Sequence, residues 1–336
     1  MAKQREDGIS WTDETWNPVR GCSRVSSGCE NCYAERMSAR FSGPGQPYVG
    51  LTRMTQGGPR WTGEIRLVPE ALDQPLRWKK PRRIFVNSMS DLFHEGVPTE
   101  FIDQIFAVMA LAPQHSYQVL TKRPARMYSY LETGECCTRW RRALASSLRA
   151  VGPERFPERL HPLPNLQLGV SVENQPTAEE RIPSLLKTPA AVRFVSYEPA
   201  LGAIDFGPWM GETTCQKRED KRHCEHWYDG DRPCCACGQT TGLDWVIAGG
   251  ESGPGARPSH PDWFRQVRDS CVAAGVPFHF KQWGAWVPGY SHNPDRQIVR
   301  STPGVGDDNW VWMQKVDKKA AGRLLDGREW QEFPEG

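Results

Sequence analysis

Six short apolar segments of this 336-residue chain each end abruptly in polar residues, and helical patterns separate most of them. They are RIFVNSMSD (Arg83–Asp91), YQVLTKRP (Tyr117–Pro124), LQLGVSVEN (Leu166–Asn174), VRFVSYEP (Val192–Pro199), LDWVIAGGES (Leu243–Ser252) and VPFHFKQWG (Val276–Gly284). An apolar body predicts a strand buried on both faces, as in a parallel sheet. The alternation predicts an α/β fold, a parallel TIM-type barrel or partial barrel whose polar strand ends share one mouth.

Three helices between these strands can be predicted from the sequence. Thr99 is a candidate N-cap for a helix whose apolar stripe runs from Phe101 to Met109. A later helix is expected to have Pro261 in its first turn and Gly275 as its stop. The segment Arg139–Ala150 is predicted as a third helix.

The pattern divides the chain into four parts. Residues 1–210 are expected to form the first part of the barrel, and residues 243–285 its last strands. Residues 211–242 are polar and rich in cysteine with no periodicity, which indicates an insertion. Residues 286–336 are irregular and end in a basic amphipathic stretch, so we expect a tail packed on the barrel.

Charge and hydropathy narrow the range of partners. The net charge is +2, so no strong overall field attracts nucleic acid or membrane. Two basic segments, Arg77–Arg83 and Arg139–Arg149, are either solvated faces or local polyanion contacts. No apolar run is long enough to cross a membrane, and the start lacks the apolar region of a signal peptide. We therefore expect a cytoplasmic protein, in the host cytoplasm if it is viral, with no membrane partner.

The stretch GCSRVSSGCENCYAERM holds three of the eleven cysteines, Cys22, Cys29 and Cys32, in a C-x6-C-x2-C pattern. In a reducing compartment such grouping indicates metal or redox chemistry rather than disulfides. Zinc normally takes four protein ligands, and no fourth Cys or His lies nearby. A [4Fe–4S] cluster held by three cysteines keeps one iron open for a further ligand. The cluster is our main interpretation; structural zinc and plain thiols are the alternatives.

A second cysteine group lies in the insertion. Its C-x2-C spacing predicts a structural zinc site that would stabilise a segment too polar to build a core. A second iron–sulfur cluster and unligated thiols are the alternatives. The expected ligands are Cys215, Cys224, Cys234 and Cys237, with His223 and His226 as alternates.

The cysteine stretch resembles the loop of radical S-adenosylmethionine (SAM) enzymes, which carry C-x3-C-x2-C with an adjacent aromatic residue. Here the first spacing is six residues, and the aromatic residue, Tyr33, follows the last cysteine instead of preceding it. Most of the chain resembles the bacteriophage and bacterial Gp37/Gp68 family (DUF5131). The segments that carry this resemblance are ISWTDETWNPVRGCSRVSSGCENCYA, FVNSMSDLFHEGVP, VLTKRP, GVSVEN, FVSYEPALG, AGGESGPGARPSHPDWFRQVRDSC and FKQWG.

The radical SAM resemblance implies roles for the polar strand ends, each of which has a strand-end hydrogen bond or structural ion pair as its alternative. The positions that would hold the SAM amino group are Ser88, Ser90 and Asp91, and those for its ribose are Ser171, Glu173 and Asn174. A GGE motif resembles the superfamily's SAM-amine motif but lies on a late strand, where it could serve the substrate instead; it consists of Gly249, Gly250 and Glu251. Expected substrate contacts are Lys122, Arg123, Glu198, Lys281 and Gln282, with Lys122 and Glu198 as candidate catalytic residues.

The resemblance also implies a reaction. Phage relatives are associated with DNA hypermodification, which implies an isomerase acting on thymine that carries a glycyl group. The product would carry the group through its α-carbon instead of its nitrogen. DNA would be the substrate, and a reductase or other electron donor a partner. The alternatives are a nucleic-acid-binding or repair protein with an iron–sulfur cluster, and a radical SAM enzyme acting on another nucleic acid.

Overall fold

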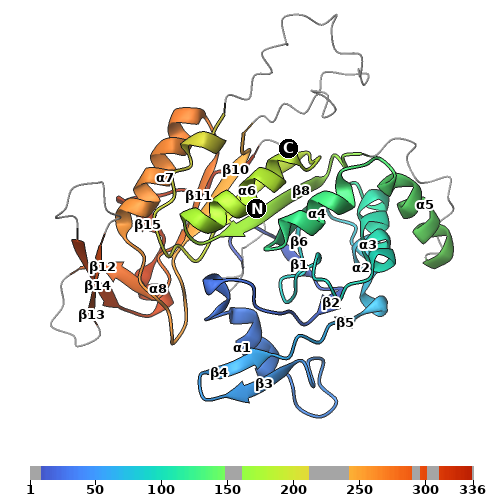
Figure 1. Cartoon of the computed structure of the whole chain (residues 1–336), viewed down its shortest axis with the longest axis horizontal. Helices are drawn as coiled ribbons and strands as arrows, with labels where there is room; N and C mark the ends of the chain where they lie inside the picture. The colour runs from blue at the N-terminus through green and yellow to red at the C-terminus, as the bar shows by residue number, and fades with distance from the viewer. Residues whose placement is uncertain (1–8, 148–160, 212–241, 290–295, 301–309, 335–336) are drawn as a thin grey trace, which may run out of the picture.

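The computed structural model describes residues 9–147, 161–211, 242–289, 296–300 and 310–334 (Figure 1). Its centre is a seven-stranded sheet in which every neighbouring pair is parallel, curled into a half barrel. The strands in spatial order are β1 (Glu14–Trp16), β6 (Arg83–Val86), β7 (Ser116–Thr121), β8 (Leu166–Val172), β9 (Val192–Tyr197), β10 (Trp245–Gly249) and β11 (Phe278–Gln282).

The prediction of a partial parallel barrel is confirmed in this form. All six predicted strands are present, and their spatial order follows their order in the chain. The sequence analysis missed β1, which pairs with β6 from Glu14 opposite Ile84 to Trp16 opposite Val86. With only three residues, β1 is too short to show a periodic pattern.

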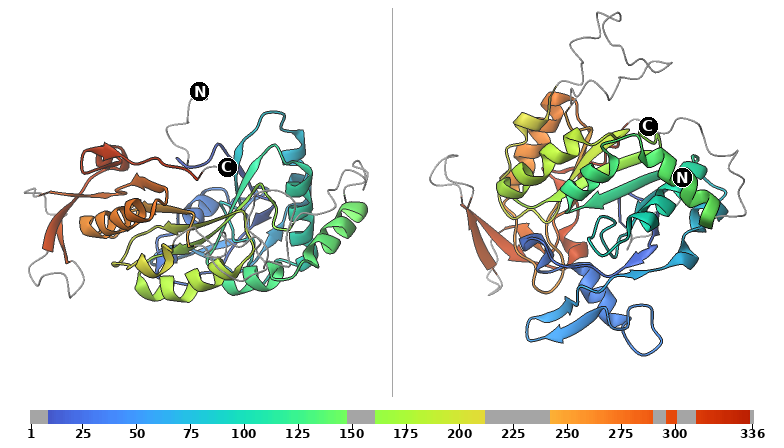
Figure 2. Two further views of the ribbon diagram at one scale, coloured as in Figure 1. Left: turned by 90° about the horizontal axis from the view of Figure 1, so that it is seen from above. Right: turned by 45° about the vertical axis from the view of Figure 1, so that its right-hand side comes forward.

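Helices join successive strands and cover the outer face of the sheet (Figure 2). Gly275, with φ of 66°, ends α7 in the left-handed conformation as expected. The predicted cap at Thr99 is wrong, because Thr99 is the first residue of α3 and Pro98 occupies the N-cap. The helices between the strands are α3 (Thr99–Leu111), α4 (Pro124–Leu131), α5 (Cys136–Ser147), α6 (Gln175–Lys187) and α7 (Pro261–Ala274).

Several small elements complete the described chain. The segment between β1 and β6 forms two-stranded ribbons and short helices: β2 (Val19–Arg20) with β5 (Arg66–Leu67), β3 (Thr52–Thr55) with β4 (Gly58–Trp61), α1 (Tyr33–Arg40) and α2 (Gln74–Arg77). The tail forms a three-stranded antiparallel sheet, a short helix and a final ribbon: β12 (Trp286–Pro288), β14 (Trp310–Lys315) and β13 (Arg296–Arg300), α8 (Lys318–Ala321), and β15 (Leu324–Leu325) with β16 (Arg328–Glu329).

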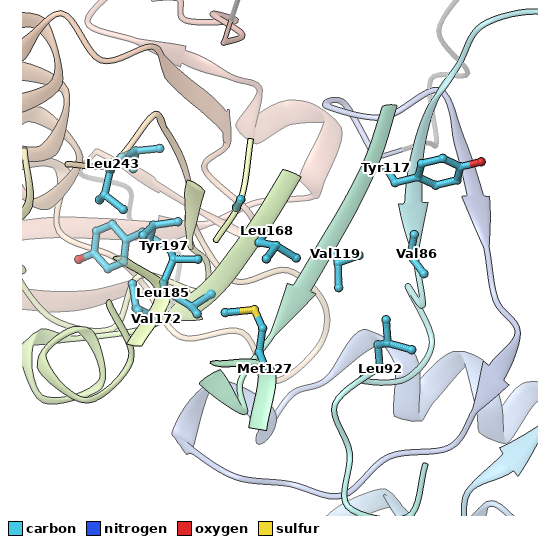
Figure 3. Packing of buried hydrophobic residues seen from close by; sticks show 14 of the residues in the cluster. Val86, Leu92, Tyr117, Val119, Met127, Leu168, Val172, Leu185, Tyr197 and Leu243 are labelled. Carbon is cyan, nitrogen blue, oxygen red and sulfur yellow. The ribbon is translucent and has the colours of Figure 1, made fainter. Parts of the chain in front are cut away.

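Alternate residues of the strands pack into two apolar clusters on opposite faces of the sheet. On β10, Val246 and Ala248 belong to the large outer core under the helices, while Trp245 and Ile247 join a smaller inner cluster. Figure 3 shows part of the outer core, where Val119 and Leu168 of the sheet lie near Met127 of α4. Burial on both faces explains why the strand bodies are continuously apolar.

The tail covers the open edge of the sheet at β11. The backbone N–H of Phe280 donates to Trp330 O at 2.9 Å, and Glu332 N donates to Phe278 O. Phe333 then crosses to the inner cluster, where its ring lies beside Trp245. An unpaired sheet edge would invite association with other chains, and this tail segment satisfies it.

Within the described residues, every helix is too short or too polar to cross a membrane. The insertion predicted at 211–242 falls almost wholly on residues 212–241, which lie outside the described part of the chain.

We expect Phe264→Ala to lower the free energy of unfolding by about 3–5 kcal/mol, since it removes a buried ring from the core. Phe264 is fully buried, and its ring centroid lies 5.0 Å from that of Phe280. The measurement is chemical denaturation of the full chain. The matched control on the same helix is Val272→Ala, which removes an exposed side chain and should change stability by less than about 0.5 kcal/mol. Equal effects of the two changes would contradict the packing of α7 on the sheet.

Candidate functional site

The three-cysteine segment, residues 22–32 (hereafter the cysteine loop), lies across the carboxyl end of the half barrel. It begins where Gly21 forms a parallel bridge with Ser90, just beyond β6. Residues beyond the ends of β6, β7, β8 and β10 contact the loop directly. The loop therefore spans most of the mouth at which the polar strand ends meet.

Glu173, directly after β8, holds the centre of the cysteine loop. Its carboxylate is fully buried, accepts hydrogen bonds from Ser26 and Lys122, and pairs with Arg181 of α6 at 3.1 Å. Gly28 passes so close that a Cβ atom there would lie 2.3 Å from Glu173 Oε1. Position 28 therefore requires glycine for the loop to sit on this carboxylate.

The charge on Glu173 is stable because its partners outweigh its burial. Burial alone would raise the pKa, but the charges of Lys122 and Arg181 and the hydrogen bonds from Lys122 and Ser26 lower it below its ordinary value of 4.5. The carboxylate is ionised at neutral pH and binds two cations at the mouth.

Glu251, after β10, anchors the far end of the loop. Its carboxylate accepts from Asn31 Nδ2 at 3.0 Å and forms a two-point ion pair with Arg257, at 2.7 and 2.9 Å. Arg257 also donates to Ser27 O and pairs with Glu30 at 2.8 Å. One arginine therefore links the strand end to two positions of the cysteine loop.

Asp91, after β6, anchors the near end through Arg123. The Asp91 carboxylate accepts from Thr121 Oγ1, from the backbone of Lys122 and from Arg123 Nη1. Arg123 in turn donates to Ser23 Oγ at 2.8 Å. His94 Nε2 donates to the same hydroxyl, since its Nδ1 accepts from the backbone N–H of Gly96.

The loop thiols lie in a shielded environment. Burial raises the pKa of Cys22 to about 12, with added contributions from Asp91 and from the other loop sulfurs and an opposing one from Arg123. Burial also raises the pKa of Cys32, and the charge of Cys29 acts in the same direction. The thiols are thus close enough to affect one another's ionisation. Among the residues that the structure describes, no group of three His, Cys, Asp or Glu side chains is close enough together to hold a metal ion. This applies to the three loop cysteines as well.

Polar side chains line the inner face of the half barrel above its apolar cluster. Lys122 Nζ donates to Ser171 on the adjacent strand, whose hydroxyl donates to the backbone of Glu198. Lys281, on β11, pairs with both carboxylate oxygens of Glu198 at 2.8 Å. This pair reaches across β10 beside Gly249, where a Cβ atom would lie in ordinary van der Waals contact with Glu198 Oε1, at 3.4 Å.

The Glu198–Lys281 pair is partly accessible to solvent. Each of its side chains is 18% exposed, whereas the Glu173 carboxylate is completely buried. Gln282 approaches the same carboxylate at 3.5 Å. Three predicted substrate contacts therefore lie together. We call this group, Glu198, Lys281 and Gln282, the inner rim.

Other predicted residues have structural partners. Asn174 caps α6 in a capping box with Thr177. Ser88 Oγ donates to Asn17, and Ser90 Oγ donates to Val19 O. Gly250 is a close backbone contact, since a Cβ atom would lie 1.9 Å from Trp283 O. These positions, with Asp91, Glu173 and Glu251, already have protein partners in the residues described. The second cysteine group, Cys215, Cys224, Cys234 and Cys237, lies outside the described residues.

The sequence analysis did not predict six residues that hold the cysteine loop in place. They are Ser23, Ser26, Gly28, Asn31, Arg181 and Arg257. Most of them lie inside the segments that carried the family resemblance. Their partners are distant in sequence, since Asn31 contacts a residue 220 positions away, so spacing alone held no signal for them.

A cavity of about 390 Å³ lies beside the loop at Val25, between α4 and α6. Four cationic side chains line it, yet Lys122 and Arg181 are held by Glu173, and Arg123 by Asp91 and Glu95. The fourth, Arg126, donates to the backbone oxygens of His94 and Val97. Three of the four cations are therefore already paired with carboxylates.

Fold and site together define a parallel α/β half barrel with a three-cysteine loop clamped over its mouth. The chain belongs to the family described as "protein of unknown function (DUF5131)", which it matches over residues 6–334. The family membership inferred from the sequence motifs is thereby confirmed. Comparison with curated proteins gave no match. Comparison with solved structures gave none either.

We expect Glu173→Gln to lower the free energy of unfolding at pH 7 by about 3–5 kcal/mol, because it leaves buried cations without a carboxylate. The folded pKa lies below the unfolded one, so the carboxylate stabilises the fold above pH 4.5 and loses this effect as the pH falls through the folded value. The difference in free energy of unfolding between variant and wild type should therefore become smaller as the pH falls below 4.5.

The measurement is denaturant unfolding over a pH series. The matched control is Glu180→Gln, which removes an exposed carboxylate 3.8 Å from the same Arg181. It should cost less than about 1 kcal/mol at any pH. A Glu173→Gln difference that does not change with pH would contradict the assigned charge state.

Proposed function

We propose that this protein is a radical SAM enzyme whose cysteine loop binds a [4Fe–4S] cluster at the mouth of the half barrel. The main observation in support of this proposal is the position of the loop. Contacts from four strand ends hold its three thiols over the carboxyl end of a parallel sheet. Parallel α/β enzymes collect their chemistry at this end.

The donor set suits such a cluster. Cys22, Cys29 and Cys32 would supply three thiolates and leave one iron open. The raised pKa values of Cys22 and Cys32 mean that cluster binding must displace their protons, which couples assembly to pH. Binding must also draw the sulfurs together, since they are not gathered tightly enough to hold a metal ion in this structure. When bound, the cluster with SAM supplies a 5′-deoxyadenosyl radical able to take hydrogen from unactivated carbon.

The substrate we propose is a thymine base in DNA that carries an amino acid, with isomerisation of its glycyl link from nitrogen to α-carbon. The accessible Glu198–Lys281 pair supports this choice. Lys281 can bind the glycyl carboxylate and Glu198 the adjacent amine, exchanging an internal ion pair for two charge-assisted contacts. The inner rim would thereby orient the α-carbon while the loop excludes water from above.

A second candidate is a nucleic-acid-binding or repair protein with a structural iron–sulfur cluster. It is favoured by the protein partners already bound to Asp91, Glu173 and Asn174, three positions expected to hold SAM. Ser88, Ser90 and the backbone N–H of Gly250 also have protein partners, so SAM binding in this chain would have to replace some of these contacts.

Protein purified without oxygen and supplied with iron and sulfide should show the brown absorption of a cluster, and should form 5′-deoxyadenosine from SAM and dithionite. Cys29→Ala should abolish both signals, since two thiolates do not hold a cubane with one open iron. The matched control is Cys137→Ala, outside the loop, which should keep both. An intact cluster that never yields 5′-deoxyadenosine would reject the enzyme in favour of the structural cluster.

If glycyl-thymine DNA is the substrate, Lys281→Met should lower kcat/KM for its isomerisation about 10- to 150-fold, the effect of losing a hydrogen bond to a charged group. Formation of 5′-deoxyadenosine without substrate should persist, since Lys281 lies on the inner rim and not in the cysteine loop. Lys319→Met, at an exposed position of α8, is the control. Unchanged kcat/KM in Lys281→Met would remove the proposed carboxylate contact, and equal turnover of unmodified DNA or RNA would reject the substrate class.

A further inference from the structure

The helix α1 and the β3–β4 ribbon follow directly on the cysteine loop and lie together at the bottom of Figure 1. We define the arginine lobe as this part of the chain, residues 33–62. Two contacts join it to the candidate site. Arg24 of the loop pairs with Glu35 of α1, and Arg36 Nη2 donates to Ser252 O, just beyond β10, at 3.1 Å. A ligand bound to the lobe therefore lies beside the mouth.

The accessible charge of the arginine lobe has a single sign. The lobe contains one acid, Glu35, which is 1% exposed and paired with Arg24. Its arginines are Arg36, Arg40, Arg53 and Arg60. None of these four forms an ion pair with an Asp or Glu among the residues that the structure describes, and the chain is described without a gap from residue 9 to residue 147. The lobe thus carries cationic charge that the protein around it does not neutralise.

The four arginines form two pairs of like charge. Arg53 and Arg60 stand directly opposite one another in the β3–β4 pairing, so they share a face of the ribbon. Arg36 and Arg40 are four positions apart on α1, so they are neighbours on the helix surface. Like charges in either arrangement destabilise the element that carries them. A bound polyanion would relieve this repulsion.

The ribbon is narrow and its side chains are accessible. Arg53 and its neighbour Met54 are exposed, Met54 by 73%. The guanidinium of Arg60 reaches the turn of the ribbon, because a Cβ atom at Gly57 would lie 2.8 Å from its Nη2. Arg40 of α1 is exposed as well. The lobe therefore presents cations to solvent from both the ribbon and the helix.

We propose that the arginine lobe binds duplex DNA through its phosphates and holds it beside the mouth. A two-stranded ribbon fits the major groove of B-form DNA. A duplex carries more charge per unit length than a single strand, so a surface whose accessible charges are all cationic binds the duplex more tightly. The inference rests on the proposed function in taking DNA as the substrate. Binding itself requires neither cluster nor SAM.

The test is fluorescence anisotropy of a fluorescein-labelled DNA duplex of about two helical turns, and of one of its strands, with full-length protein at about 50 mM salt and no SAM. Arg53→Gln should weaken duplex binding about 10-fold and reduce the slope of log affinity against log salt by about 1, the effect of one lost phosphate contact. The double variant Arg40→Gln/Arg53→Gln should reduce the slope by about 2. Arg53→Lys, which keeps the charge, should retain most of the affinity.

Controls separate this surface from folding and from net charge. Arg323→Gln removes an exposed arginine that is paired with Glu329 at 3.1 Å, and should leave binding unchanged. The unfolding temperature of Arg53→Gln should be no lower than that of wild type, because the change relieves the repulsion with Arg60. Weaker binding accompanied by a lower unfolding temperature would assign Arg53 to folding and overturn the proposal.

Two further results would overturn the proposal. One is a duplex affinity no higher than that of the single strand, or one unchanged in Arg53→Gln. The other is arginine-dependent binding to phosphatidylcholine vesicles that contain phosphatidylserine, without DNA binding, which would assign the lobe to a membrane surface. Failure of the proposed chemistry is distinguishable: protein that binds duplex through Arg53 but forms no 5′-deoxyadenosine keeps the role of the lobe and rejects the enzyme.

Discussion

The buried carboxylate of Glu173 organises the mouth of this protein. It sits at the end of the central strand β8, completely removed from solvent, and is neutralised by Lys122 from the neighbouring strand and Arg181 from the following helix. A charge in that position is tolerated only with such partners. Because the same carboxylate accepts from Ser26 and lies against Gly28, the balance that keeps it ionised also holds the cysteine loop in place.

The other anchors repeat this arrangement at the two sides of the mouth. Asp91 with Arg123, and Glu251 with Arg257, each join a strand end to the loop through a carboxylate and an arginine. Three carboxylates that resemble ligand-binding positions thus serve to position three thiols. On the inner rim, the Glu198–Lys281 pair is partly exposed above the apolar cluster.

The sequence analysis predicted which types of residue meet at the mouth better than it predicted what each residue binds there. Strand ends rich in polar residues were expected at a common mouth, and the parallel sheet brings Lys122, Ser171 and Glu198 together there. Asn174 was expected near a ligand, yet it is the cap of α6, since N-cap and ligand positions both favour the same residue type after a strand. Strand β1 was missed because three residues do not establish a period, and its pairing with β6 is visible only in space.

The sequence by itself determined the class of fold and the six longer strands, because burial of both sheet faces imposes continuous apolar runs whatever the tertiary details. It also established the family, through motifs spread over nearly the whole chain. Only the tertiary structure decided which polar residues hold the cysteine loop and which remain on the accessible rim. Contacts such as Asn31 with Glu251 join positions 220 residues apart, and no local pattern encodes a partner that the fold alone brings within hydrogen-bonding distance.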